Sequence, residues 1–538
     1  MHPIKRGYLQ VGGRRVHYRR LGAGPPLVML HGSPGDSAML EPEMAAASAH
    51  FTCIALDTPG FGGSDPLPGD VLTVADLAGA TAEAMAALGL PACRVYGTHT
   101  GAAIGVELGA GWPERVSGLV LEGLPMFTEA ETKVLFEGYF ARMVPDPLAG
   151  HLTRTWMRFR DQFTWFPWTA RHVSRLNPVD RPTPDEIQHW VMMYNYARKT
   201  YLPAYRAACF YGREAYRAAE LLARPAVYMA TEEDMLFGHL DRLPPLKAQQ
   251  RVVRLPYDTP AKHQAIVRFL REIPSEGRVA PVGTPLPVGV DPALQFFDAP
   301  DGQIFTRCYG DPVNPAVILL HDAPGTGLAL EGLARRLSQR AYVVLPDLPG
   351  TGESAAPTDD RDILAVSARA LASIADALGL TRFFIAATGC GAAVAAHFAG
   401  RDDPRLMAII VEQLPVPDES VATAIAPDLP LSPEGAHWLK LWLMLRDGQI
   451  YRPWFDGSVR AQRRSQGNFD AEWLHDQTFA VMKSRTSYHR LPRAAFRFDN
   501  ARALGESAAP VSIAADGAFE NCIAASLIQG AVSEAGVS

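Results

Sequence analysis

The stretch Val95–Glu122, VYGTHTGAAIGVELGAGWPERVSGLVLE, decides how the rest of the chain is interpreted. It predicts a buried strand, a sharp turn, a helix and a second strand, with His99 at the turn. Gly97 and Gly101 flank this histidine at the spacing of a nucleophile elbow, where small residues allow a strained turn that lifts the central side chain into a pocket. A Ser, Asp or Cys could form a covalent intermediate there. An imidazole does not do so in the usual way, so the pattern indicates a site that is either repurposed or retired.

Length and composition narrow the classes of protein. At 538 residues the chain exceeds what one hydrophobic core usually holds, which predicts two domains. The net charge is −6 and the pI is near 6.2, so we expect no broad basic surface. Nucleic acid is therefore disfavoured as a partner. The six cysteines lack CxxC spacing, which disfavours a disulfide framework and a structural zinc site. No apolar signal core or membrane-length run occurs, so we expect a cytoplasmic protein without membrane association.

Along the first half, apolar strand-like runs alternate with helical patterns. Such alternation predicts a mostly parallel sheet with right-handed crossovers. The expected elements before the elbow are a hairpin over 8–20, strands over 26–30 and 51–56, and a helix over 71–88. After about a hundred residues of aromatic-rich helical sequence, strands are expected over 224–230 and 251–255.

Four motifs carry a family resemblance: HGSPG at 31–35, DTPGFGGSD at 57–65, GTHTG at 97–101 and WPERVSGLVLEG at 112–123. In this order they resemble the α/β-hydrolase superfamily, and the first half is most similar to its haloalkane dehalogenase and epoxide hydrolase branch. The resemblance implies a helical lid over about 126–222 and no cofactor. It also implies a catalytic His after the last strand, but the loop there is short. His263 is the nearest imidazole and falls inside the following helix, where it is either catalytic or a surface residue.

The pattern starts again after a Pro/Gly-rich linker at 273–293. Residues 1–272 are therefore predicted as one α/β-hydrolase domain, and 294–538 as a degenerate, C-terminally truncated copy with its own lid over about 416–508. In a gapless alignment of the copies, His99 falls on Gly389 and Glu122 on Glu412. We expect the second copy to be catalytically silent, because its elbow has no side chain.

The candidate catalytic residues are His99, Glu122 and Asp234, with the backbone amides of Ser33 and Thr100 as an oxyanion site. His99 would act as a base, held by a carboxylate on its other nitrogen. Which acid pairs with it stays open. Glu122 recurs in the copy that lacks an elbow side chain, which also allows a structural role, and Asp234 ends a sequence typical of helix caps.

The lid contributes the tryptophans Trp156, Trp165 and Trp168. Together with Arg154 and Arg158 they could form an apolar pocket for a small aromatic or alicyclic carboxylate. Most of this lid motif recurs in the second half, which instead favours a role in holding the lid together.

Two functions are consistent with the sequence. The first is an enzyme that uses His99 as base or nucleophile on a small apolar carbonyl, ester or related substrate, by hydrolysis or lyase-type cleavage, without cofactor or metal. The alternative is a non-catalytic pseudo-hydrolase that binds a small ligand or a protein partner, because a lidded apolar pocket needs no triad to hold a molecule.

Overall fold

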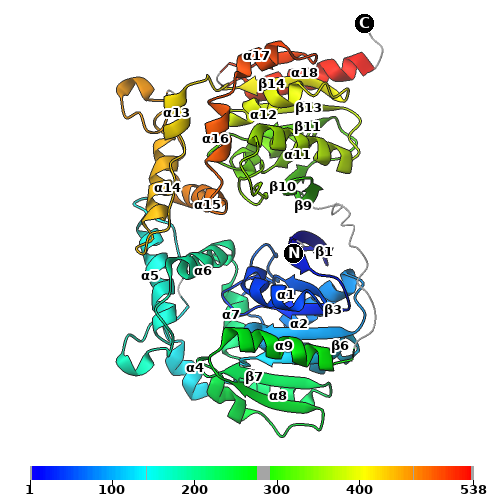
Figure 1. The fold of residues 1–538 in the computed structure, drawn as a ribbon, viewed down its shortest axis with the longest axis vertical. Helices are drawn as coiled ribbons and strands as arrows, with labels where there is room; N and C mark the ends of the chain where they lie inside the picture. Colours follow the sequence, from blue (N-terminus) through cyan, green and yellow to red (C-terminus); the bar gives the residue numbers. More distant parts are fainter. Residues whose placement is uncertain (1–2, 141, 275–290, 464–465, 516, 535–538) are drawn as a thin grey trace. The chain divides into compact units, whose positions relative to one another are not determined.

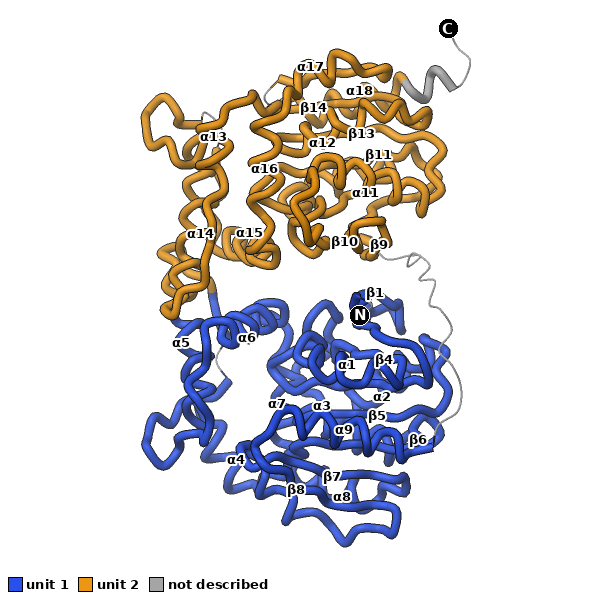
Figure 2. Tube along the Cα trace, viewed as in Figure 1, with its two compact units in different colours: residues 1–144, 153–285 blue, residues 145–152, 286–538 orange. Residues whose placement is uncertain are grey.

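The computed structural model describes residues 3–140, 142–274, 291–463, 466–515 and 517–534. The chain divides into two compact units, the first formed by residues 1–144 and 153–285 and the second by residues 145–152 and 286–538 (Figure 2). The segment 145–152, inside the region predicted as the first lid, thus groups with the second unit. Most of the predicted linker, at 275–290, lies outside the described residues.

The first unit is built on an eight-stranded sheet (Figure 1). The β1–β2 and β2–β4 pairs are antiparallel, and the other neighbouring pairs are parallel. In sheet order the strands are β1 (Lys5–Val11), β2 (Arg14–Leu21), β4 (Thr52–Leu56), β3 (Pro26–Leu30), β5 (Cys93–Thr98), β6 (Val116–Glu122), β7 (Ala226–Thr231) and β8 (Gln250–Leu255). The central strands β3, β4 and β5 are buried along their whole length, as expected of parallel strands covered on both faces.

Helices flank this sheet. Helix α1 (Glu41–Ala47) packs with α9 (Thr259–Glu272), and α3 (Thr100–Gly111) packs with α2 (Val74–Ala87) and α8 (Gly212–Leu221). Met29 and Val120 of the strands join Met44 of α1 and Phe269 of α9 in one buried cluster. The rest of the region between β6 and β7 forms α4 (Glu129–Leu135), α5 (Gly150–Thr164), α6 (Pro184–Ala197) and α7 (Leu202–Cys209).

The second unit repeats the same topology with seven strands. In sheet order they are β9 (Ala293–Ala299), β10 (Gly302–Tyr309), β12 (Tyr342–Pro346), β11 (Ala316–Leu320), β13 (Phe383–Thr388), β14 (Leu406–Glu412) and β15 (Val511–Ile513). Within the described residues β15 is the edge strand, and the chain continues into α18 (Phe519–Glu534) without a counterpart of β8.

Helices also cover this second sheet. They are α10 (Glu331–Leu337), α11 (Ile363–Ala377), α12 (Cys390–Ala399), α13 (Glu419–Ala424), α14 (Ala436–Asp447), α15 (Ala471–Met482), α16 (Arg490–Ala495) and α17 (Asn500–Gly505). Ile318 and Leu320 join a core with α11 and α12, whereas Val317 and Leu319 join a core with α10 and α18, as the alternation of side chains along a strand requires. The predicted fold class, two tandem helix-flanked and mostly parallel sheets, is confirmed. No helix among the described residues is long and apolar enough to cross a membrane.

Candidate active site

His99 lies at a tight turn between β5 and α3. Its backbone has φ 49° and ψ −111°, a conformation that costs free energy for a residue with a side chain. The neighbouring glycines make the turn possible, because a Cβ atom at Gly101 would overlap the carbonyl of Leu30 and one at Gly97 would overlap the backbone of Gly101. The Gly-x-His-x-Gly pattern thus forms the strained turn that its spacing predicts.

Asp234, which follows β7, is the acid that contacts this histidine. Its Oδ2 lies 3.0 Å from Nε2 of His99, while its Oδ1 accepts the backbone N–H of Leu236 at 2.8 Å. Burial disfavours the charged imidazole, but the Asp234 carboxylate outweighs it and raises the pKa of His99 above its ordinary value. Burial likewise opposes ionisation of Asp234, and His99 outweighs it, so the pKa of Asp234 is lowered. The described residues provide no hydrogen-bond partner for Nδ1 of His99.

Glu122, the other candidate acid, is held by different groups. The hydroxyl of Tyr96 donates to its Oε2, and Nζ of Lys262 donates to its Oε1 at 3.2 Å. Lys262 also pairs with Glu43 at 3.3 Å. Burial opposes the charge on Lys262, but the two carboxylates outweigh it and raise the pKa of the ammonium group, which stays cationic. Burial raises the pKa of Tyr96, which stays a donor.

Sequence reasoning did not identify Lys262, Tyr96 or Glu43, all of which line the same cavity as His99. The available signal was the short loop after β8, which brings the first turns of α9 close to the site. Within that helix Lys262 reaches Glu122, whereas His263 pairs with Glu43 at 3.3 Å and does not line the cavity.

The two residues predicted to form an oxyanion site lie side by side. The backbone N–H of Ser33 donates to the hydroxyl of Thr100 at 3.3 Å, which is long for a hydrogen bond. The backbone N–H of Thr100 lies in the first turn of α3, where no helical acceptor is available. Both residues line the cavity, and the hydroxyl oxygen of Ser33 is buried without a partner among the described residues.

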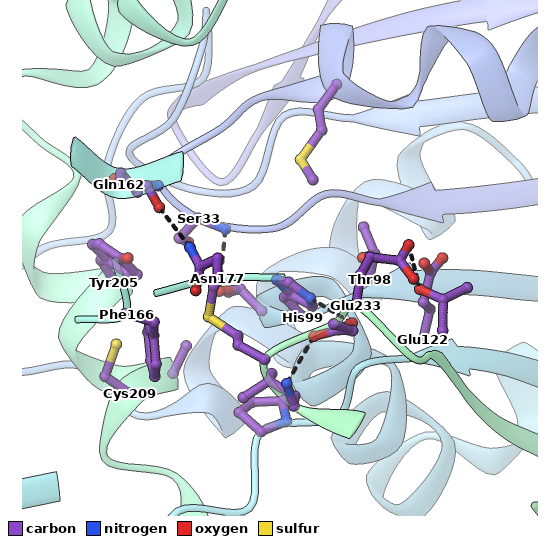
Figure 3. A pocket seen from close by; sticks show the side chains of 18 of the residues that line it. Ser33, Thr98, His99, Glu122, Gln162, Phe166, Asn177, Tyr205, Cys209 and Glu233 are labelled. Carbon is purple, nitrogen blue, oxygen red and sulfur yellow. Dashed lines mark hydrogen bonds and ion pairs between the residues drawn. The ribbon is translucent and has the colours of Figure 1, made fainter. Parts of the chain in front are cut away.

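The cavity has a volume of about 350 Å³. Figure 3 shows lid residues such as Gln162 and Phe166 on one side and His99 with Glu233 on the other. Its walls are rich in aromatic side chains, namely Phe127, Phe136, Tyr139, Phe163, Phe166, Trp190 and Tyr205. The cavity therefore has an apolar wall and a polar floor.

None of the three predicted tryptophans lines this cavity; the lid tryptophan that does is Trp190. Trp156 is buried, and the guanidinium of Arg158 lies over the rings of Phe159, Trp168 and Tyr194. Arg154 and Trp165 are also outside the lining. The helical period of α5 directs Trp156 and Phe159 into the lid interior, which the residue types alone did not reveal.

The second unit repeats the turn without a side chain. Gly389 has φ 54° and ψ −128°, close to the values of His99. Glu412, the counterpart of Glu122, accepts the backbone N–H of Gly517 at 3.3 Å. No group of three or more His, Cys, Asp or Glu side chains suited to a metal ion occurs in the described part of either unit.

Comparison with known proteins agrees with this architecture. Haloalkane dehalogenase 2 of Mycobacterium tuberculosis is 29% identical over 147 residues, which are 27% of this chain and 50% of that protein. Proline iminopeptidase of Neisseria gonorrhoeae is 31% identical over 149 residues, 27% of this chain and 48% of that protein. The chain thus spans about half the length of these curated relatives.

Among solved structures, epoxide hydrolase A from Mycobacterium thermoresistibile is 19% identical, with 51% of this chain and 100% of that chain covered and a TM-score of 0.41. The family model of the alpha/beta hydrolase fold matches residues 25–258 and 315–452, so it covers most of the chain and reaches both units. The chain belongs to the α/β-hydrolase fold family.

Proposed function

We propose that the first unit is a hydrolase, or a lyase of related chemistry, in which neutral His99 is the general base. The observation that carries this proposal is the pairing of Nε2 of His99 with Asp234 at the strained turn. When Nε2–H donates to the carboxylate, the lone pair of the neutral ring is on Nδ1, which has no partner among the described residues. That nitrogen is available to take a proton from water or from a substrate in the cavity.

The chemistry follows from the arrangement of charges. As Nδ1 takes the proton, the imidazolium is stabilised by Asp234, which does not need to move or become protonated. The negative charge that develops on a carbonyl oxygen would be met by the backbone N–H groups of Ser33 and Thr100. The long bond from Ser33 N–H to the Thr100 hydroxyl is weak, so a substrate oxygen can replace it.

The cavity favours a small, apolar carbonyl compound or ester. The wall is rich in aromatic side chains, which would exclude water from the body of such a substrate. Four buried polar atoms of lining residues, Oγ of Ser33, Oε2 of Glu43, Oε1 of Gln162 and Oε2 of Glu233, have no partner among the described residues. A substrate with hydrogen-bonding groups would satisfy them.

The rival function is ligand binding without turnover, and one observation favours it. The raised pKa of His99 increases the share of imidazolium near neutral pH, and an imidazolium cannot act as a base. In that form His99 would bind an anionic or hydrogen-bond-accepting ligand under the lid.

A substrate panel tests the enzyme proposal. We expect turnover of p-nitrophenyl esters, epoxides or haloalkanes by the full chain, and loss of that turnover in His99→Ala. His50→Ala is the matched control, because His50 is exposed and outside the cavity lining. Unchanged turnover in His99→Ala would remove His99 from the mechanism. A rise in melting temperature with ligand but no turnover of any probe would support the rival.

A further inference from the structure

The second unit contains a cavity of about 300 Å³ beside its own elbow. Asp322 and Gly389 line it, together with apolar side chains of the helical region, among them Ile425, Met444 and Trp454. In the repeat, Asp322 takes the place of Gly32 in the oxyanion turn of the first unit. The floor of this cavity thus carries a carboxylate at the position where the first unit has a glycine.

The carboxylate of Asp322 occupies the site that an oxyanion would need. Its Oδ1 accepts the backbone N–H of Ala323 at 2.8 Å and that of Cys390 at 2.7 Å. These amides correspond to those of Ser33 and Thr100 in the first unit. Both are saturated by an internal negative group, so this cavity is unsuited to an anion or to a developing oxyanion.

The same carboxylate also fills the space of the missing elbow side chain. A Cβ atom at Gly389 would overlap the carboxyl group of Asp322, so glycine at the elbow and aspartate in the turn depend on each other. A side chain at this elbow would therefore displace the carboxylate from its two backbone amides.

Within the described residues, no lysine, arginine or histidine side chain forms an ion pair with this carboxylate. The two arginines of the lining are exposed and bonded elsewhere: Arg452 donates to the side chain of Gln413, and Arg463 donates to the carbonyl of Gly448. The Cys390 thiol lies 3.2 Å from the carbonyl oxygen of Ala323, and burial followed by the Asp322 charge raises its pKa, so it stays neutral.

We propose that this second cavity binds a small organic cation, a protonated amine with an apolar or aromatic body. The ammonium group would donate to the carboxylate of Asp322, which lines a mostly apolar cavity and forms no ion pair with the exposed Arg452 and Arg463 of the same lining. The body would pack on Met444 and Trp454, and an aromatic face near a cation adds further attraction. This proposal does not depend on the chemistry of His99.

Three probes of one shape test this on the full chain: benzylamine, benzyl alcohol and benzoate, each titrated by calorimetry. We expect saturable binding of benzylamine and weaker binding of the other two. Asp322→Asn keeps an oxygen for the two backbone amides but removes the charge, and should weaken benzylamine binding by about tenfold or more. The loss in Asp322→Asn places the ligand in the second unit, because Asp322 lines only the second of the two cavities.

Equal affinity for benzylamine and benzyl alcohol in the unaltered protein would overturn the proposal, and this comparison needs no variant. Preference for benzoate, absence of saturable benzylamine binding, or full affinity in a folded Asp322→Asn variant would each overturn it as well. Asp322→Gly frees the two amides, so benzoate binding should increase in that variant relative to the unaltered chain.

Discussion

Nε2 of His99 lies 3.0 Å from Oδ2 of Asp234, which brings together two residues separated by 135 positions in the chain. Among the described residues that line the first cavity, His99 is the only histidine. Any acid–base chemistry by an imidazole in this cavity therefore depends on the pair, and four predictions follow from its surroundings.

Asp234→Asn should lower kcat/KM for the best probe ester by about 10²-fold or more, because the amide neither favours the tautomer with a lone pair on Nδ1 nor stabilises the imidazolium. Steady-state kinetics measures the loss. Glu122→Gln is the comparison at the other acid, whose carboxylate is bonded to Tyr96 and Lys262 rather than to the imidazole of His99, and it should affect the rate less than Asp234→Asn. The reverse order would assign the orienting role to Glu122.

The pH profile should report the raised pKa of His99. A general base is active when neutral, so kcat/KM should increase with pH through a value above 6.5, the ordinary pKa of the group. Asp234→Asn removes the carboxylate that raises the pKa of His99, so the rising limb of the kcat/KM profile should move to lower pH. A limb that stays in place in that variant would show that another group titrates.

Lys262→Met should destabilise the protein, because it leaves Glu122 and Glu43 buried without their shared cation. Removal of one partner from a buried ion pair costs about 3–5 kcal/mol of unfolding free energy, which chemical denaturation can measure. Lys262 also lowers the pKa of His99, so that pKa should be higher in Lys262→Met. The rising limb of the kcat/KM profile should then move to higher pH. In the double variant with Glu122→Gln part of the stability should return; no recovery would contradict the pairing.

Gly123→Ala should impair the site directly. Gly123 has φ +59°, and a Cβ atom there would lie 2.5 Å from Cδ2 of His99 and 2.7 Å from Oδ2 of Asp234. We expect loss of both activity and stability. Gly111→Ala, at the end of α3 where no atom from another part of the chain lies within 4 Å of the added Cβ, is the control and should leave activity intact. Equal activity in both variants would show that the His99–Asp234 pair tolerates displacement.

Much of the fold can be predicted from the sequence, because turns, strands and helices depend largely on residues that are close together along the chain. Small residues around His99 predict the turn, since only they avoid backbone overlap there. The alternation of strands and helices predicts both sheets, and the repeat predicts that the second elbow has no side chain.

Contacts within the site depend on the tertiary structure. The choice of Asp234 over Glu122 follows from the order of β5, β6 and β7 in the sheet and from the loop after β7, which no local pattern encodes. Lys262 rather than His263 reaches Glu122 because of where the helical phase of α9 places each side chain. Backbone geometry is thus determined by neighbouring residues along the chain, whereas the partners of a buried charge are determined by packing between distant segments.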